Sequence, residues 1–297
     1  MRLPHSRTGA VAAAALAVGV AVPSAAPAAF AATWTRTSDY SRWTGVTALE
    51  RGQGIATDGA SFYYSGTWSL AKTTIDGDRQ LTSSAAAIPG ALSGTYKSDH
   101  IGDIDYHDGL VVAPLEDGGN DYKNPLIALY SADDLSYTGR YVRLPLAPLP
   151  GGVPWVAVDA SAGLVYTAAW DQDAAQGTDR LVAFSLDALL TAPAGTELPV
   201  VKTVKLSRPL SRIQGAAMSG GLLWASVDIT GDKSVYSIDP ASGAVSWQFH
   251  QDVEPDDEVE GIAAVDLGPA GGRLHVLNVG SGWKKIFLYL QHYSSTG

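Results

Sequence analysis

The chain has 297 residues, of which 46% are hydrophobic and 17% charged, with 30 Asp and Glu against 20 Lys and Arg and no Cys. The acidic balance argues against nucleic acids and anionic membrane surfaces as partners, because both are bound through clustered Lys and Arg. Without Cys the fold depends on burial alone, which a chain of this length can achieve as one large all-β domain or as two smaller ones.

The N-terminus has the pattern of a secretory signal peptide. Arg2 and Arg7 precede an apolar stretch over 9–22, and small residues follow as far as Ala29-Phe30-Ala31, which fits a cleavage site. The 14 apolar residues are too few to cross about 30 Å of hydrocarbon. We therefore expect residues 1–32 to be removed and the protein to be extracellular. Removal takes away two arginines and no acids, so the charge of the mature chain is 18 − 30 = −12.

Five apolar runs that open beside a small or turn residue recur along the rest of the chain, and they are expected to be first strands. They cover 53–58, 101–105, 154–159, 214–218 and 260–266. The steps between them, from Gly54 onward, are 48, 52, 61 and 46 residues. This period is long for a solenoid repeat and typical of a propeller blade.

Each repeat continues in the same order, with a turn, a second strand, a polar loop and a third strand. The second strands are expected at 62–65, 110–115, 164–170, 222–227 and 274–279, and the third at 70–75, 125–130, 180–186, 234–238 and 284–293. Asp108-Gly109 predicts a hairpin turn, 185–191 a short helical turn, and 244–250 a fourth strand.

These elements predict an all-β fold, a single β-propeller over 33–297 with five blades of four antiparallel strands. The last repeat lacks a fourth strand after Tyr293, while Trp34 to Trp43 is unassigned. We expect this N-terminal strand to complete the final blade and close the ring. The long third interval leaves room for extra strands between Leu186 and Arg212, so six blades remain an alternative.

Propeller topology places the residues before the first strands and those after the second strands on one face. The residues before the first strands are Gln53, His100, Val153, Gln214 and Glu260. Among these residues and those in the loops after the second strands, we expect ligand-binding roles for Gln53, Gln214, Glu116, Trp170, Asp171, Asp228 and Asn278.

His100 is the leading candidate for a catalytic residue, because a histidine at a channel mouth can act as acid or base near neutral pH. Asp99 and Asp103 flank it, and a carboxylate partner would orient its ring. Glu260 is expected across the channel as a second titratable group, so the catalytic candidates are His100, Asp103 and Glu260. The alternative is a histidine that only satisfies backbone groups.

Acidic and aromatic side chains allow two further readings. The run from Asp252 to Glu260 has the oxygen ligands that calcium prefers, although its spacing is not that of an EF-hand and a solvated loop is the simpler interpretation. Trp68, Trp170 and Trp283 are either sugar platforms or core residues, whereas core packing is expected for Trp155 and Trp224. Nucleophile elbows, P-loops and zinc spacings are absent from the sequence.

The blade openings, such as Glu260-Gly261-Ile262-Ala263, resemble those of secreted bacterial propellers of the NHL, gluconolactonase-like and YncE-like group. Calcium-dependent lactonases of that group hold their ion with a Glu and asparagines at the channel mouth. The resemblance implies a match for Glu260, while Gln53, His100 and Gln214 depart from the asparagines.

Two functions follow as hypotheses. The first is a binding module, expected to be monomeric, that holds a small ligand or a glycan at the channel mouth. The second is a hydrolase or lyase acting on a lactone or glycan with Glu260 and His100 as acid and base, with or without a divalent cation such as calcium. A protein-partner scaffold is a third class, which a large exposed apolar patch would indicate.

Overall fold

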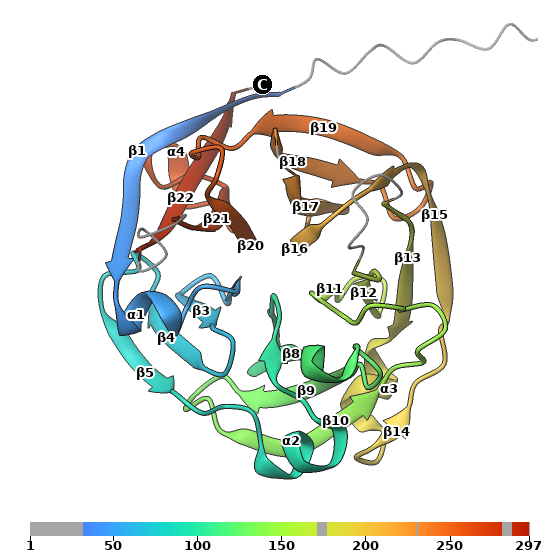
Figure 1. Cartoon of the computed structure of the whole chain (residues 1–297). Helices are drawn as coiled ribbons and strands as arrows, with labels where there is room; N and C mark the ends of the chain where they lie inside the picture. Colours follow the sequence, from blue (N-terminus) through green and yellow to red (C-terminus); the bar gives the residue numbers. More distant parts are fainter. Residues whose placement is uncertain (1–31, 171–176, 230, 281–286, 297) are drawn as a thin grey trace, which may run out of the picture. The chain divides into compact units, whose positions relative to one another are not determined.

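The computed structural model describes residues 32–170, 177–229, 231–280 and 287–296, and the chain from Ala32 onward forms one compact unit. In this unit five antiparallel sheets stand around a central axis as the blades of a propeller (Figure 1). The predicted fold class is confirmed. Residues 1–31, nearly all of the predicted signal peptide, lie outside the described residues.

The blades follow one another along the chain, each running from an inner to an outer strand. The first contains β2 (Gly54–Thr57), β3 (Ser61–Ser65), β4 (Leu70–Thr74) and β5 (Gln80–Ser84). The second contains β6 (His100–Ile101) and β7 (Asp105–His107), which both pair with β8 (Leu110–Glu116), then β9 (Leu126–Ser131) and β10 (Tyr137–Arg143). The third contains β11 (Ala157–Asp159), β12 (Leu164–Thr167), β13 (Thr178–Ser185) and β15 (Lys202–Leu210).

The last two blades have the same plan. The fourth contains β16 (Ile213–Ser219), β17 (Leu222–Ile229), β18 (Asp232–Ile238) and β19 (Val245–His250). The fifth contains β20 (Glu258–Ala264), β21 (Leu274–Val279), β22 (Phe287–Thr296) and, outermost, β1 (Thr33–Thr44).

The ring is closed by the N-terminal strand, as predicted. β1 pairs antiparallel with β22 from Thr33 opposite Thr296 to Thr44 opposite Phe287, with one register shift between Arg36 and Tyr40. Because β1 completes the last blade, its pairing with β22 closes the ring without a disulfide. This pairing also covers the edge that β22 would otherwise expose.

The long third interval adds to an existing blade. The Ser185 side chain accepts a hydrogen bond from the Ala188 amide and caps the predicted helical turn, α3 (Leu186–Thr191). β14 (Thr196–Glu197) then pairs with β10 and widens the second blade. The described residues therefore form five blades. The remaining short helices are α1 (Val46–Leu49), α2 (Gly90–Tyr96), η1 (Gly118–Asn120) and α4 (Gly268–Gly271).

Aromatic and branched side chains fill the spaces between blades. Trp155 and Tyr166 of the third blade pack with Tyr236 of the fourth in one buried cluster, so Trp155 is a core residue as expected. Trp224 is half-buried, with its ring 5.3 Å from that of Trp34 between the fourth and fifth blades. The predicted hairpin turn at 108–109 is also confirmed, because Asp108 and Gly109 both have positive φ angles, of 44° and 77°.

Candidate functional site

The inner strands meet at the propeller axis through their glycines. A Cβ atom on Gly261 would lie 2.6 Å from the Cα of Gly54, and one on Gly215 would lie 2.6 Å from the Cα of Gly261. Only hydrogen atoms fit between these backbones. The recurring glycine of the blade openings therefore lets the inner ends of β2, β16 and β20 touch, and they form a floor across the axis.

Asp103 is the centre of this floor. Its carboxylate oxygens accept hydrogen bonds from the backbone amides of Ile55, at 2.8 Å, and Ala216, at 3.0 Å, and the Ile262 amide also bonds to it. Its own amide donates to the Pro154 carbonyl at 2.8 Å. One residue of the second blade thus ties together the other four. Burial raises the pKa of the Asp103 carboxyl well above its usual range, although the backbone amides oppose this effect.

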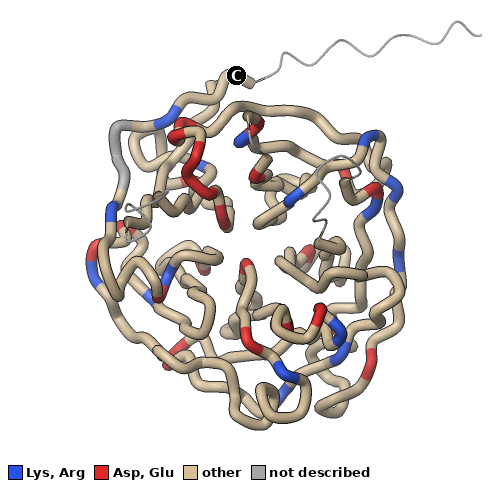
Figure 2. The backbone as a smooth tube through the Cα atoms, in the orientation of Figure 1, with Lys and Arg blue, Asp and Glu red and all other residues tan. Residues whose placement is uncertain are grey.

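A pocket of about 230 Å³ adjoins this floor on one face of the ring. All five blades contribute to its lining, which consists of Gln53, His100, Gly102, Asp103, Glu116, Gly118, Tyr122, Pro154, Trp170, Gln214, Glu258 and Glu260. Seven of the side chains selected from the sequence are thereby brought together, among them His100, Asp103 and Glu260. Figure 2 shows acidic positions on segments that approach the axis, including the start of β20.

His100 is held by two side chains of the pocket. Its Nδ1 lies 3.1 Å from Oε2 of Glu116, and its Nε2 bonds to Oε1 of Gln53, whose amide nitrogen donates to the Gly52 carbonyl. Both ring nitrogens therefore face oxygen atoms, and Glu116 and Gln53 together fix the orientation of the His100 ring.

The orienting partner of His100 differs from the flanking residues considered in the sequence. The carboxylate of Asp99 accepts from the amides of Gly118 and Gly119, each at 2.9 Å, and so holds the loop after β8. Asp103 is occupied in the floor. Glu116 takes the role because β6 and β8 pair with His100 opposite Glu116. Oε1 of Glu116 is buried and has no hydrogen-bond partner in the described part of the chain.

Glu260 is the least compensated group in the pocket. It is 4% exposed, and no described residue donates a hydrogen bond to its carboxyl group. Burial raises its pKa well above the usual range, and the nearby carboxylates of Glu258, Asp228 and Asp103 add to this effect, while Arg212 opposes it.

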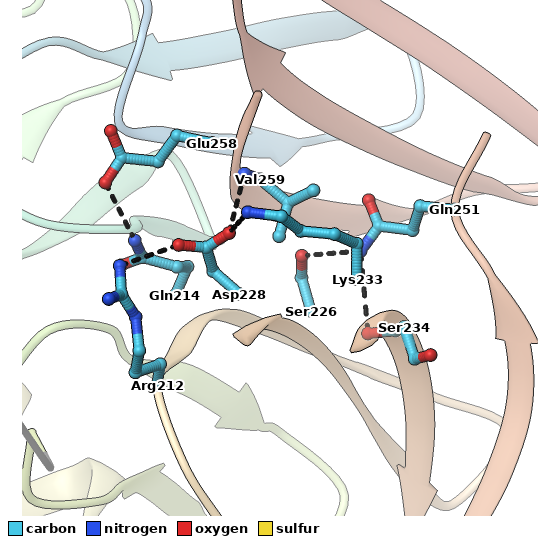
Figure 3. Close-up of polar contacts among 9 residues, drawn as sticks. All are labelled: Arg212, Gln214, Ser226, Asp228, Lys233, Ser234, Gln251, Glu258 and Val259. Atoms are coloured by element: carbon cyan, nitrogen blue, oxygen red, sulfur yellow. Dashed lines mark hydrogen bonds and ion pairs between the residues drawn. The ribbon is translucent and has the colours of Figure 1, made fainter. Parts of the chain in front are cut away.

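Asp228 lies behind the pocket wall instead of lining it. Its carboxylate accepts from Nη2 of Arg212 at 2.7 Å and from Nζ of Lys233, so both neighbouring cations are paired with it (Figure 3). Gln214 donates to Glu258 at 3.4 Å in the same region. Asp228 is therefore absent from the lining of the pocket, and its ligand-binding role stays a prediction.

Two other predicted ligand-binding residues do not contribute to this pocket. Asn278 is 2% exposed and lines a separate cavity of about 460 Å³ together with Arg36 and Asp252. Asp171 lies outside the described residues, as does Trp283. Trp68 is 62% exposed and is absent from the lining of the pocket, whereas Trp170 belongs to it.

Sequence reasoning missed two lining residues, Glu258 and Tyr122. Glu258 could have been found, because it precedes Glu260 by two positions in one strand and alternate residues share a face. Tyr122 is positioned by a loop whose fold depends on Asp117, which accepts from Asn120 and Asn124 at 2.9 and 2.8 Å. No periodic pattern marks such a loop.

Calcium binding, which the sequence leaves open, stays open. Within the described ranges no group of three or more His, Asp or Glu is placed to hold a metal ion. Gln53 bonds to His100, and Gln214 donates to Glu258, so these side chains do not form with Glu260 the ligand set that the resemblance to lactonases implies.

A search of the same ranges for a helix that is long and apolar enough to cross a membrane finds none.

Comparison with known proteins supports the fold. No protein-family model and no curated protein matches the chain. Among solved structures, the chain is similar to a glutaminyl cyclase from Myxococcus xanthus, with a TM-score of 0.56 and 14% identity over 90% of this chain and 98% of the other. A gluconolactonase from Xanthomonas campestris has a TM-score of 0.49 and 11% identity over 89% of this chain and 94% of its own. The likeness to the glutaminyl cyclase, at the higher TM-score, confirms the predicted resemblance for the fold alone.

Proposed function

We propose that the protein is a secreted propeller that binds a small ligand or a sugar in the axial pocket. The observation that carries this proposal is convergence: polar side chains between residues 53 and 260, from all five blades, meet in one cavity beside a closed floor. A concave site with a few convergent polar groups is the usual form of a ligand pocket. Secretion rests on the N-terminal sequence pattern alone.

The size and rim of the pocket limit the ligand. Its volume of about 230 Å³ is below the range of about 300–1,000 Å³ typical of drug-sized ligands. This favours a ligand of monosaccharide size over a long oligosaccharide. Trp170 and Tyr122 offer aromatic faces on which a sugar or another ring can stack.

A thermal-shift and calorimetric screen of small sugars, lactones, amines and calcium against the purified protein tests this function. A true ligand should bind about 10-fold more weakly to Trp170→Ala, because an aromatic contact in the pocket is lost. The matched control is Trp247→Ala in β19, a tryptophan that is 50% exposed and absent from the pocket lining. Equal loss in both variants, or no loss in either, would place the binding elsewhere.

Acid–base catalysis is the second candidate function. It is favoured by the contact between His100 and Glu116 in the same pocket as Glu260, and the chain's fold is similar to that of an enzyme, glutaminyl cyclase. His100, held by Glu116, would act as one of the two acid–base groups. Glu260 would act as the second, and each would exchange a proton with the bound lactone or glycan. We assign Asp103 to the floor, since both its oxygens are bound to backbone amides.

Turnover of lactones and aryl glycosides tests the second candidate. His100→Gln and Glu260→Gln should each lower kcat by at least about 100-fold, the usual contribution of a general acid or base. Asp256→Asn is the control, because it removes one exposed carboxylate from the acidic run without touching the pocket lining. Unchanged turnover after Glu260→Gln would contradict its role.

A further inference from the structure

The axial pocket is strongly acidic. Four carboxyl side chains line it, those of Asp103, Glu116, Glu258 and Glu260, while no Lys or Arg of the described residues belongs to the lining. Arg212 and Lys233 are both paired with Asp228 behind the wall, and Arg212 also lies over the Trp170 ring, 5.8 Å from its centroid. The positive charge near the pocket is therefore already engaged by Asp228 and Trp170.

The four carboxyl groups differ in how well they are satisfied. Asp103 is saturated by backbone amides, and Glu258 accepts from Gln214. Glu116 uses Oε2 for His100 and leaves Oε1 buried without a partner, and Glu260 accepts no hydrogen bond from a described residue. Glu260 thus presents an unpaired carboxyl group to the cavity, whereas Oε1 of Glu116 is enclosed beside Gly152.

An unpaired buried carboxylate is costly, because burial removes part of its hydration. A ligand that supplies N–H donors and a positive charge would satisfy Glu260 through short charge-assisted hydrogen bonds.

We infer that the ligand of the axial pocket is a small organic cation with an amine or guanidinium group, whose N–H groups donate to Glu260. This inference rests on the proposed function and names the ligand class for it. Tyr122 lines the same pocket and adds an aromatic ring for cation–π attraction, whereas the Trp170 ring already has Arg212 over it. Anionic ligands are disfavoured by all four carboxyl groups.

Proton release on binding would accompany this recognition. In the free protein, burial raises the pKa of Glu260, with Asp103, Glu258 and Asp228 acting in the same direction and Arg212 against it, while the second blade contributes His100 and Glu116 to the same cavity. A bound ammonium group stabilises the ionised form of Glu260. Binding of a cation below neutral pH should therefore expel a proton, which a neutral ligand would not do.

Three compounds of nearly equal shape separate the ligand classes: benzylamine, benzyl alcohol and benzoate. Isothermal titration calorimetry of the purified protein should show benzylamine binding at least about 10-fold more tightly than benzyl alcohol, and benzoate the weakest of all. Repetition in two buffers with different ionisation enthalpies measures the proton release. Equal affinities, or a preference for benzoate, would overturn the inference.

Variants locate the recognition. Glu260→Gln should weaken benzylamine binding about 10- to 100-fold, the effect of one lost charge-assisted hydrogen bond. It should leave the affinity for benzyl alcohol within about twofold, which shows that the pocket is still folded. Asp256→Asn controls for a general loss of negative charge and should change the affinity for benzylamine by less than about twofold.

The outcomes distinguish this inference from the proposed function. If a sugar, lactone or neutral probe binds in a Trp170-dependent manner and benzylamine does not, the cation inference fails and the binding function stands. A saturable response to calcium without any response to benzylamine also overturns the inference. If no compound binds, both proposals fail.

Discussion

Asp103 and Glu260 are two buried carboxyl groups at the same axis, and they have opposite surroundings. Asp103 is 0% exposed and accepts backbone amides from three blades, whereas Glu260 is 4% exposed and accepts no hydrogen bond from a described residue. Both carboxyl groups are buried and burial raises the pKa of both, while their bonding differs. Burial alone therefore does not distinguish a carboxyl group that is bonded within the fold from one that is available to a ligand.

The contrast follows from position in the blade. Asp103 interrupts the inner edge of the second blade between β6 and β7, so its side chain reaches the amides of facing strands across the axis. Glu260 lies one residue before the glycine at which β20 meets the axis, among other carboxyl groups. In this ring, the backbone amides at the axis bond to the carboxylate of Asp103. The carboxyl group of Glu260 lies in the pocket without such donors.

The largest effect is expected where the floor is tightest. Gly261→Ala would place a Cβ atom 2.6 Å from the Cα of Gly54, and the backbone cannot yield without opening the ring. We expect a loss of more than about 4 kcal/mol in the free energy of unfolding, measured by urea denaturation, or failure to fold. Gly94→Ala in α2 is the control, because its Cβ atom would meet no atom within 4 Å. If both variants were equally stable, the floor would not be a tight contact.

Removal of the saturated carboxylate should be the next largest effect. Asp103→Ala leaves the amides of Ile55, Ala216 and Ile262 buried without an acceptor. The expected loss is about 3 kcal/mol in the free energy of unfolding, and Asp103→Asn should lose less because it retains one acceptor oxygen. A mild effect of Asp103→Ala would remove the distinction drawn between Asp103 and Glu260.

The same contrast shows how far the sequence could be interpreted. The repeat of apolar runs and glycines predicts the five blades, the N-terminal closing strand and the convergence of His100, Gln214 and Glu260, since topology alone sets these positions. It does not predict that Asp103 bonds to three blades or that Glu116 orients His100. Those contacts depend on the inward bend between β6 and β7 and on the register of β6 with β8, which no periodicity encodes.

A buried base extends the comparison to a third titratable group. His275 is 0% exposed, with Nε2 donating to the Val265 carbonyl and Nδ1 bonded to His292, and burial lowers its pKa to about 3. Below pH 6.5 the unfolded chain binds a proton that the folded chain does not, so stability falls as the pH drops from 6.5 towards 3.

Between pH 7 and 5 this linkage amounts to about 2 kcal/mol. Urea denaturation should show the wild type losing about that much more stability than His275→Gln over this interval. Between pH 7 and 8 the two proteins should change in parallel, which serves as the control. A parallel change between pH 7 and 5 as well would mean that His275 is protonated in the folded protein.

Glu260→Gln should have the smallest effect and the opposite sign to Asp103→Ala. Since the pKa of Glu260 is raised in the folded protein, its contribution to stability is present below the unfolded value of 4.5 and is lost as the pH rises above it. Gln removes this loss, so Glu260→Gln should gain about 1 kcal/mol at pH 7 and nothing at pH 4. Asp256→Asn, at an exposed carboxylate, should stay within about 0.5 kcal/mol of wild type at both values. A loss at pH 7 would show that Glu260, like Asp103, is bound within the fold, and it would leave the pocket without the unsatisfied group on which recognition of a cation depends.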